Sequence, residues 1–321
     1  MLEVRNDPIT IGDTTIPPGR KIRLELPFAT LSTGSVASLP VAVINGRSTG
    51  PNVWISGAVH GDELNGVEIV RRVMRLLDAK KLRGAVIAVP IVNPLGFIHE
   101  SRYLPDRRDL NRSFPGSPRG SSASRLAHLF MTEIVAQSVV GIDCHTATGN
   151  RINVPQIRTD TDDPETLKLA RAFGTQFTIH ARLRDGSLRE AATSRGIKVL
   201  LLEAGQAHRF DDFAIKSGVN GIMRTLRSLN MIDARLPQGK KTEVIRKTRW
   251  VRARRGGLAT VLPKLGERVE AGQVVAEISD AFGYRPAPVK ASATGWIIGK
   301  TQAPQVNPGD ALVNIGVDDS I

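Results

Sequence analysis

From residue 51 onward, short runs of apolar residues alternate with segments in which apolar residues recur every three or four positions. The runs are rich in Val and Ile and nearly continuous, which is typical of strands covered on both faces: VWISGAV, AVIAVPIVN, VVGIDCH and KVLLLEAG. The periodic segments between them predict helices over residues 64–77, 123–135 and 165–172. Strands that alternate with helices predict an α/β fold with a mostly parallel or mixed central sheet flanked by helices.

The two ends of the chain have a different pattern. In residues 1–50, short apolar runs carry interleaved polar residues with Pro or Gly at the breaks, which predicts a β-rich lead-in to an α/β domain spanning 1–240. After residue 240, Gly and Pro separate short alternating runs, so we expect a small all-β domain over 241–321. KLGERVEAGQVVAEI, ASATGWI and VNPGDALVNIG resemble the barrel-sandwich hybrid of biotinyl and lipoyl carrier domains. Tyr284 stands where such carriers have their modified lysine, which argues against covalent carrier function.

Composition is that of a globular protein. Of 321 residues, 41% are hydrophobic and 23% charged, and the apolar runs end far short of the ~20 residues that cross a bilayer. The N-terminus lacks a basic-then-apolar signal pattern, so we expect no membrane association and a cytoplasmic location. The single cysteine, Cys144, cannot form an internal disulfide and is expected to pack behind a site.

The net charge of +13 is the unusual compositional feature. Most basic residues are scattered along predicted helices and loops, and only residues 239–255 form a concentrated basic run. With three Trp and two Tyr in the whole chain, few side chains can stack on bases, which argues against a nucleic-acid partner. The basic run leaves open an acidic protein partner.

Candidate metal ligands follow two of the apolar runs. His60 and Glu63 are three residues apart after the first run, and His145 ends the third. Two imidazoles and a carboxylate are the ligands that a catalytic zinc needs while a fourth position stays open, so we predict one Zn²⁺ per chain on these residues. Asp143, two residues before His145, is expected to orient a ligand imidazole. As a structural alternative, His60 ends the strand and Glu63 favours the start of the next helix.

Two further segments carry candidate chemistry. LLLEAGQ brings Glu203 out of an apolar strand, which is costly unless the charge is used or paired. A long loop contains Arg102, Asp109, Asn111 and Arg112. Because guanidinium groups bind carboxylates in two-pronged geometry, Arg102 and Arg112 favour an anionic substrate. A solvated basic loop is the alternative, and it suits Arg107, Arg108 and Arg119.

The order HGDE, SRY, DLNR, DCHT and LLEAGQ resembles the succinylglutamate desuccinylase and aspartoacylase family, relatives of zinc carboxypeptidases. The resemblance covers about residues 50–240, and the C-terminal domain is also similar. It implies zinc on the ligands named above and Glu203 as general base and acid. It also implies Arg102, Asn111 and Arg112 as groups that hold substrate carboxylate or carbonyl oxygen, with Asp109 bracing them. Arg189, in GSLREAA, is a further expected carboxylate contact, and Tyr284 is expected at the mouth of the site.

Three functions remain open at this point. The leading interpretation is a zinc-dependent amidohydrolase that cleaves a small anionic N-acyl amino acid. The alternative is a metallocarboxypeptidase acting on a peptide or isopeptide C-terminus, and the width of the entrance, which we expect residues 270–300 to cover, separates the two. A lesser alternative is a non-catalytic protein that binds an acidic partner through the basic run. A homo-oligomer is left open.

Overall fold

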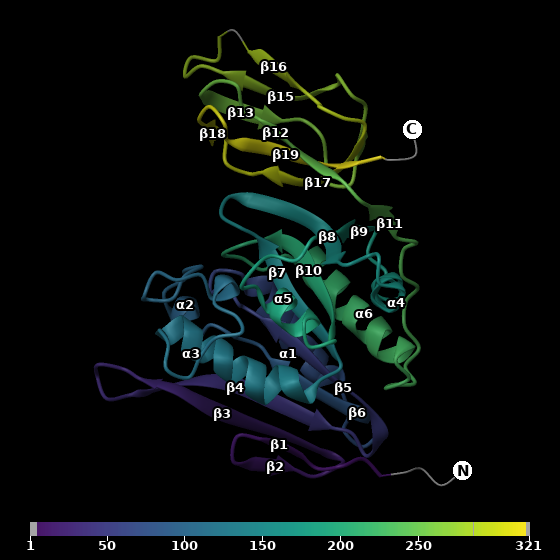
Figure 1. Ribbon diagram of the computed structural model, residues 1–321. Coiled ribbons are helices and arrows are strands. Elements are labelled where there is room, and N and C mark those ends of the chain that lie inside the picture. Colours follow the sequence, from purple (N-terminus) through teal and green to yellow (C-terminus); the bar gives the residue numbers. More distant parts are fainter. Residues whose placement is uncertain (1–4, 285, 319–321) are drawn as a thin grey trace.

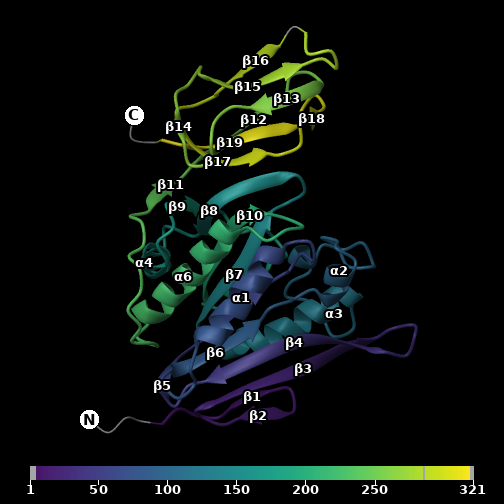
Figure 2. The same ribbon diagram turned by 180° about the vertical axis from the view of Figure 1, so that it is seen from behind.

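One mixed β-sheet runs through the molecule. The computed structural model describes residues 5–284 and 286–318. The strand order is β3-β4-β6-β5-β7-β10-β8-β17-β19-β12, and β9 and β11 continue the sheet beside β8 (Figures 1 and 2). The strands β6, β5, β7 and β10 are parallel to one another, whereas β4 and β8 pair antiparallel with them. The predicted α/β class is therefore confirmed, with a sheet of the mixed kind.

The elements before residue 240 follow the predicted alternation of strands and helices. The strands are β1 (Ile9–Ile11), β2 (Thr14–Ile16), β3 (Arg20–Thr30), β4 (Val36–Asn45), β5 (Ser48–Gly57), β6 (Arg83–Val89), β7 (Val140–Ala147), β8 (Arg151–Thr159), β9 (Phe177–His180) and β10 (Lys198–Gln206). The α-helices are α1 (Leu64–Leu76), α2 (Pro94–Ile98), α3 (Ser122–Leu129), α4 (Pro164–Phe173), α5 (Leu188–Thr193) and α6 (Asp212–Ser228).

Helices cover both faces of the sheet, which explains the unbroken apolar strands. Val53, Trp54 and Ile55 of β5 are fully buried, and successive side chains point to opposite faces. Val53 and Ile55 join the core beneath α1, α4 and α6, whereas Trp54 joins the core beneath α3 and α5. Cys144 is fully buried in the first of these cores, as expected.

The predicted helix over 123–135 is interrupted in the structure. After α3, residues Phe130–Ile134 form a π-turn and Val135–Gln137 a 3₁₀ turn. The buried face is nevertheless continuous, because Leu126, Phe130 and Ile134 all belong to one core. The apolar period thus predicted burial correctly, while the hydrogen-bond pattern of the last turns departs from it.

The chain ends in a C-terminal β unit, residues 248–317. Its strands are β12 (Thr248–Arg252), β13 (Gly257–Val261), β14 (Arg268–Val269), β15 (Val274–Ser279), β16 (Ala287–Lys290), β17 (Gly295–Thr301), β18 (Gln305–Val306) and β19 (Ala311–Val317). The sheet β16-β15-β13-β18 packs on β12, β19 and β17 around a small apolar core.

Strand pairing joins the C-terminal β unit directly to the main sheet. The first half of β8 pairs with β17 and the second half with β9. β11 (Glu243–Ile245) also pairs with β9, so the sheet continues across residue 240, where we expected a domain boundary. Because backbone hydrogen bonds fix the register of β8 and β17, side chains of the C-terminal β unit hold defined positions near β8. Within the described ranges, none of the helices is both long and apolar enough to span a membrane.

Candidate metal centre and active site

Three adjacent parallel strands bring the candidate residues together. β5, β7 and β10 lie side by side, and Glu203 on β10 is in register with His145 on β7. Since the carboxyl ends of parallel strands meet at one edge of a sheet, residues distant in sequence converge there. The β10 register shifts just after Glu203, where Gly205 adopts a φ of +74°. Such irregularities re-aim side chains near functional sites.

A tight turn after β5 places His60 and Glu63. Ala58 has a φ of +49°, a conformation that costs energy in a residue with a Cβ. Its carbonyl and that of Gly57 accept hydrogen bonds from Asn93 and Val92, at 2.9 and 3.0 Å, which hold the turn. Gly61 packs against the backbone of Gly96 so closely that a Cβ would lie 2.0 Å from it. The glycine in HGDE is therefore required by packing.

Glu63 lies between the two imidazoles. Its Oε1 is 2.8 Å from Nδ1 of His60, and its Oε2 is 2.9 Å from Nδ1 of His145. Ligand atoms from the three residues all lie within 4.8 Å of one another, and the three side chains are buried. Although Glu63 precedes the first residue of α1, it makes no cap hydrogen bond to that helix. The carboxylate thus faces the imidazoles, which disfavours the structural alternative for this residue.

Carboxylates behind the imidazoles fix their orientation. Nε2 of His145 is 2.7 Å from Asp143, whose other oxygen accepts a 2.8 Å hydrogen bond from Ser56. Nε2 of His60 is 3.2 Å from Asp109. Each imidazole therefore directs Nδ1 toward Glu63 and pairs Nε2 with an aspartate. Metal-binding histidines commonly have one ring nitrogen at the metal and the other paired with a carboxylate. The side chains present fit a divalent cation held by His60, Glu63 and His145.

The charges of this cluster are strongly coupled. Burial opposes ionisation of Glu63, but the His60 and His145 imidazoles outweigh burial and hold the pKa of this carboxyl well below its ordinary value. Burial likewise opposes protonation of His145, yet Asp143 and Glu63 raise the pKa of its imidazole well above the usual value. Because an imidazole must be deprotonated to bind a metal, cation binding at this cluster would compete with protons.

Glu203 lies beside the metal cluster. Its Oε2 accepts a 3.0 Å hydrogen bond from Nδ2 of Asn153, on the neighbouring strand β8. Burial raises the pKa of Glu203, while the nearby charges of Arg158 and His145 and the Asn153 hydrogen bond oppose the rise. A carboxyl group whose pKa is shifted toward neutral pH can both accept and release a proton.

The long loop between α2 and α3 places the predicted substrate-binding residues. Asp109 accepts hydrogen bonds from Nε and Nη2 of Arg102, at 3.2 and 2.9 Å, and from the backbone of Asn111 at 2.8 Å. Asp109 therefore braces the loop. The side-chain oxygen of Asn111 accepts from the backbone of Leu188, which leaves the amide nitrogen available to a ligand. Arg102, Asn111 and Arg112 line the cavity in front of the metal cluster.

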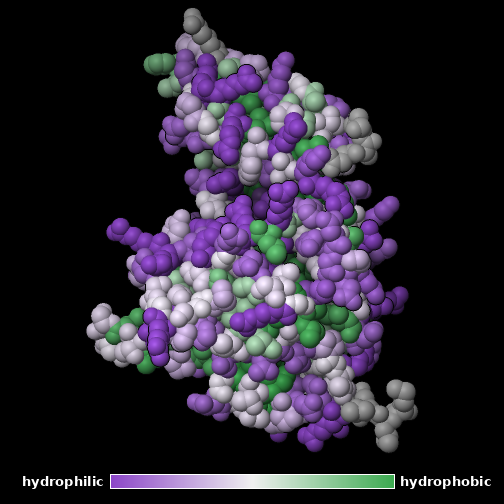
Figure 3. Space-filling model, viewed as in Figure 1, coloured by the Kyte–Doolittle hydropathy of each residue, from purple (hydrophilic) through white to green (hydrophobic). Residues whose placement is uncertain are grey.

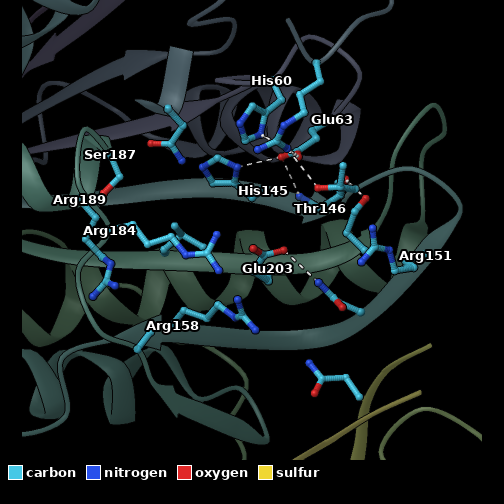
Figure 4. Close-up of a pocket in the computed structure, with 18 of the residues that line it drawn as sticks. His60, Glu63, His145, Thr146, Arg151, Arg158, Arg184, Ser187, Arg189 and Glu203 are labelled. Atoms are coloured by element: carbon cyan, nitrogen blue, oxygen red, sulfur yellow. Dashed lines mark hydrogen bonds and ion pairs between the residues drawn. The ribbon is translucent and has the colours of Figure 1, made fainter. Parts of the chain in front are cut away.

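The cavity has a volume of about 400 Å³ and contains more polar groups than the sequence predicted (Figure 4). The polar and aromatic residues that line it without having been predicted are Thr146, Thr148, Arg151, Asn153, Arg158, Arg182, Arg184, Ser187, Trp250 and Asn314. Most of them come from β8, from the loop before α5 and from the C-terminal β unit. On the face drawn in Figure 3, hydrophilic side chains predominate where that unit meets the rest of the chain.

The C-terminal β unit reaches the cavity with other residues than expected. Tyr284 lies in the turn between β15 and β16, is 71% exposed, and does not belong to the described lining of the cavity, so its expected place at the mouth is wrong. Residues 270–300 do not contribute to that lining either. Trp250 and Asn314 contribute instead, because β12 and β19 lie nearer to β8 than the β15–β16 hairpin does. Arg189 does line the cavity and is buried.

A second group with metal-ligand chemistry is weaker. His180 lies near Asp160 and Asp162, and one potential ligand atom from each lies within 4.8 Å of the others. Asp162 is exposed and already pairs with Arg246 at 2.8 Å. This group is therefore explained as a surface ion pair.

Comparison with protein families gives one match that spans the site. The model of the succinylglutamate desuccinylase/aspartoacylase catalytic domain matches residues 49–229. The N-alpha-acetyl-L-2,4-diaminobutyric acid deacetylase of Halomonas elongata is 28% identical over 309 residues, which cover 91% of this chain and 90% of that protein. A succinylglutamate desuccinylase of Pseudomonas aeruginosa is 27% identical over 140 residues, 40% of this chain and 41% of that protein.

Solved structures share the fold over nearly the whole chain. A succinylglutamate desuccinylase/aspartoacylase from Rhodobacter sphaeroides has a TM-score of 0.84 at 26% identity and covers 95% of this chain and 98% of that chain. The product-bound ectoine utilization protein EutE (DoeB) from Ruegeria pomeroyi also has a TM-score of 0.84, at 22% identity, over 98% of this chain and 100% of that chain. The similarity includes the C-terminal β unit.

Proposed function

Because the chain belongs to the succinylglutamate desuccinylase/aspartoacylase family, we propose that it is a zinc-dependent deacylase of a small N-acyl amino acid. Relatives named deacetylase and desuccinylase hydrolyse C–N amide bonds, and the chain is a hydrolase of this class. The observation that carries the proposal is the convergence of His60, Glu63 and His145 beside Glu203, on three neighbouring strand ends. Zinc suits this donor set of two imidazoles and one carboxylate.

His60, Glu63 and His145 would hold the cation. When bound, it supplies a Lewis acid that polarises the amide carbonyl and makes water easier to deprotonate at neutral pH. Asp109 holds Arg102 so that its Nη1 lies beside Glu63, on the same side of the cavity as the metal ligands. The positive charge of Arg102 would stabilise the carbonyl oxygen as that oxygen becomes negative.

Glu203 moves the proton. Its carboxylate takes a proton from the attacking water as the new C–O bond forms at the amide carbon. It then gives that proton to the nitrogen as the C–N bond breaks, so the products are a carboxylate and a free amine. Asn153 holds the carboxylate in place during both transfers. Asn111 and Arg112 would bind the carboxylate of the amino acid portion.

The size of the cavity favours a small substrate over a peptide. About 400 Å³ suits a molecule of N-acyl amino acid size, and Trp250 and Asn314 of the C-terminal β unit line the cavity. The alternative, a metallocarboxypeptidase, needs space beyond these residues for a peptide chain. Arg102 and Arg112 would serve a deacylase and a carboxypeptidase equally well. The size of the cavity is therefore the feature that distinguishes the two functions.

The structure of the basic run, residues 239–255, gives little support to the alternative of a non-catalytic protein that binds an acidic partner. Trp250, within the run, lines the cavity, and Arg252 and Arg255 donate hydrogen bonds to backbone carbonyls within the C-terminal β unit. These residues therefore have structural uses. A cytoplasmic location and the oligomeric state stay predictions.

The test is amine release by the zinc-loaded protein from a panel of acetyl, succinyl and aspartyl amides of amino acids, with dipeptides as the competing class. We expect release from at least one N-acyl amino acid and its loss when a chelator removes the metal. Release from dipeptides alone would favour the carboxypeptidase, and release from neither class would refute the proposal.

A further inference from the structure

A second cavity lies away from the active site, between strand β3 and the C-terminal half of helix α1. Its volume is about 520 Å³. We call it the α1 groove and define it by the charged side chains on its walls, which are Lys21, Arg23, Glu25, Arg71 and Arg75. Among the described residues, none lines both the α1 groove and the cavity in front of the metal cluster. The groove is therefore a separate site.

The groove exists because short side chains lie between long ones. Ala42 of β4 belongs to the core beneath α1, and Pro40, two residues earlier, is on the same face of the sheet. Arg23 and Glu25 of β3 lie directly opposite Ala42 and Pro40, so they project from that face as well. On this face α1 covers β5 and β7, whereas β4 and β3 lie beyond the helix at the end of the sheet (Figure 2). The short side chains of β4 thus leave a trough between β3 and α1.

The wall on α1 has more positive than negative charge. Glu68, Arg71, Arg72 and Arg75 are spaced i, i+3, i+4 and i+7, which places them along one side of the helix. Carboxylate oxygens of Glu68 lie 2.8 to 3.2 Å from all three guanidiniums. Arg71 and Arg75, which line the groove, therefore share one carboxylate with Arg72 and keep a net positive charge on this wall.

The wall on β3 has two cations close together. Nζ of Lys21 donates a hydrogen bond to the carbonyl of Met74, in the last turn of α1. Partial burial lowers the pKa of Lys21, and the charge of Arg23 contributes in the same direction, whereas Asp78 opposes both. Across residues 5–284 and 286–318, Arg23 forms no ion pair with a carboxylate, so its guanidinium is available to a ligand.

The floor between the two walls is apolar. Met74 is 9% exposed, and Pro40, Ala42 and Pro90 also line the groove. Four cations line it against one described carboxylate, that of Glu25. An apolar floor between two cationic walls complements a ligand that has an apolar body and an anionic group toward each wall. A second copy of this chain is a poor occupant, because the net charge of the chain is +13.

We propose that the α1 groove binds a small organic dianion, whose apolar body lies on the floor and whose carboxylate or phosphate groups face Arg23 on one wall and Arg71 and Arg75 on the other. The volume of the groove is in the range of small-molecule sites. Arg71 and Arg75 lie about 10 and 16 Å along α1 from the end that follows Glu63. The dianion therefore does not compete with the substrate, and this inference does not rest on the proposed function.

The test compares probes that share one apolar chain and differ in charge, by isothermal titration calorimetry of the zinc-loaded protein at low salt. Suberate has two carboxylates, octanoate has one and octanamide has none. We expect the affinity to rise about two- to fivefold with each added carboxylate, which is the scale of an exposed ion pair, and the gain to shrink as salt is added. Octane-1,8-diphosphonate shows whether phosphate-like groups are preferred over carboxylates, and tighter binding of either dianion than of octanamide supports the inference. Equal affinity for all probes, or no binding of either dianion, would overturn it.

Two variants of neighbouring β3 residues should have opposite effects. Arg23→Gln should weaken suberate binding about two- to fivefold, whereas Glu25→Gln should strengthen it by a similar factor, and neither should change octanamide binding. A loss of structure would weaken binding in both variants, so the opposite signs distinguish charge from structure. Arg119→Gln removes a positive charge from an exposed position elsewhere and should keep the wild-type affinity. Suberate affinity that neither β3 variant changes would overturn the inference.

An active-site variant shows where the probe binds. Arg112→Gln alters the cavity in front of the metal cluster and should leave suberate binding to the α1 groove unchanged. Suberate binding that Arg112→Gln abolishes and Arg23→Gln preserves would place the probe in the active-site cavity and overturn the inference. Tighter binding of triglutamate than of suberate, weakened by Arg23→Gln, would identify an acidic peptide as the ligand and overturn the small-molecule assignment. Arg23→Gln should keep wild-type amine release, so failure of this inference leaves the proposed function intact.

Discussion

Asn153 provides the sharpest prediction, because a single hydrogen bond links it to the proposed base. Its Nδ2 donates to Oε2 of Glu203 at 3.0 Å and so stabilises the ionised carboxylate. A hydrogen bond to a charged group contributes about 1.5–3 kcal/mol. The carboxylate faces the cavity, so the lower end, about 1.5 kcal/mol or roughly tenfold in the ionised fraction, applies. Asn153→Ala should therefore raise the pKa of Glu203 further above its ordinary value.

The assay is the pH profile of kcat/KM for amine release. Glu203 must be ionised to accept a proton, so activity falls as the pH drops through its raised pKa. In Asn153→Ala this fall should begin at a higher pH, and kcat/KM on the acid side should be about tenfold below wild type, with a smaller difference at higher pH. An equal loss at every pH would show that Asn153 has only a structural role.

Two further variants make the test specific. Asn150→Ala removes a nearby exposed side chain and should leave the profile unchanged. Gly299 of β17 faces Asn153 so closely that a Cβ would lie 2.6 Å from Oδ1 of Asn153. Gly299→Ala should therefore displace the amide and shift the profile in the same direction as Asn153→Ala. A shift in Asn150→Ala as large as that in Asn153→Ala would contradict the reasoning.

Three other predictions concern the same cluster. Glu203→Gln should keep bound metal but lower kcat by about 10²–10⁴-fold, measured by steady-state amine release beside elemental analysis; near-normal turnover would remove Glu203 from the mechanism. Asp143→Ala removes the 2.7 Å contact to Nε2 of His145 and should weaken zinc binding by about 10- to 100-fold. Competition with a chromogenic chelator measures the affinity, and an unchanged affinity would contradict the orienting role of Asp143. Zinc affinity should also fall as the pH drops through the raised pKa of His145, since the protonated ring cannot bind metal, and a flat titration would contradict this coupling.

The sequence predicted the parts of the site that follow buried strands. Each of His60, His145 and Glu203 interrupts an apolar run near its end, and a polar residue there is informative because burial without a partner is costly. The strand and helix pattern also predicted the α/β class, since a sheet buried on both faces needs unbroken apolar strands.

The missed residues depend on long-range pairing that local patterns do not contain. Arg158 and Asn153 reach the cavity because β8 pairs antiparallel with β10, and nothing in their own segment identifies that partner. Trp250 reaches the cavity because β17 pairs with β8 and thereby fixes the position of the C-terminal β unit to which Trp250 belongs. Tyr284 was misplaced for the same reason, because its hairpin lies on the far sheet of the C-terminal β unit (Figure 1).

The central claim is that His60, Glu63 and His145 bind one divalent cation. The most direct measurement is the zinc content per chain, by elemental mass spectrometry after dialysis against zinc and then metal-free buffer. We expect one zinc per chain in the wild type, a loss in His145→Ala, and wild-type content in His128→Ala, whose imidazole lies on α3. A wild-type chain without zinc, or a His145→Ala variant that retains it, would contradict the account.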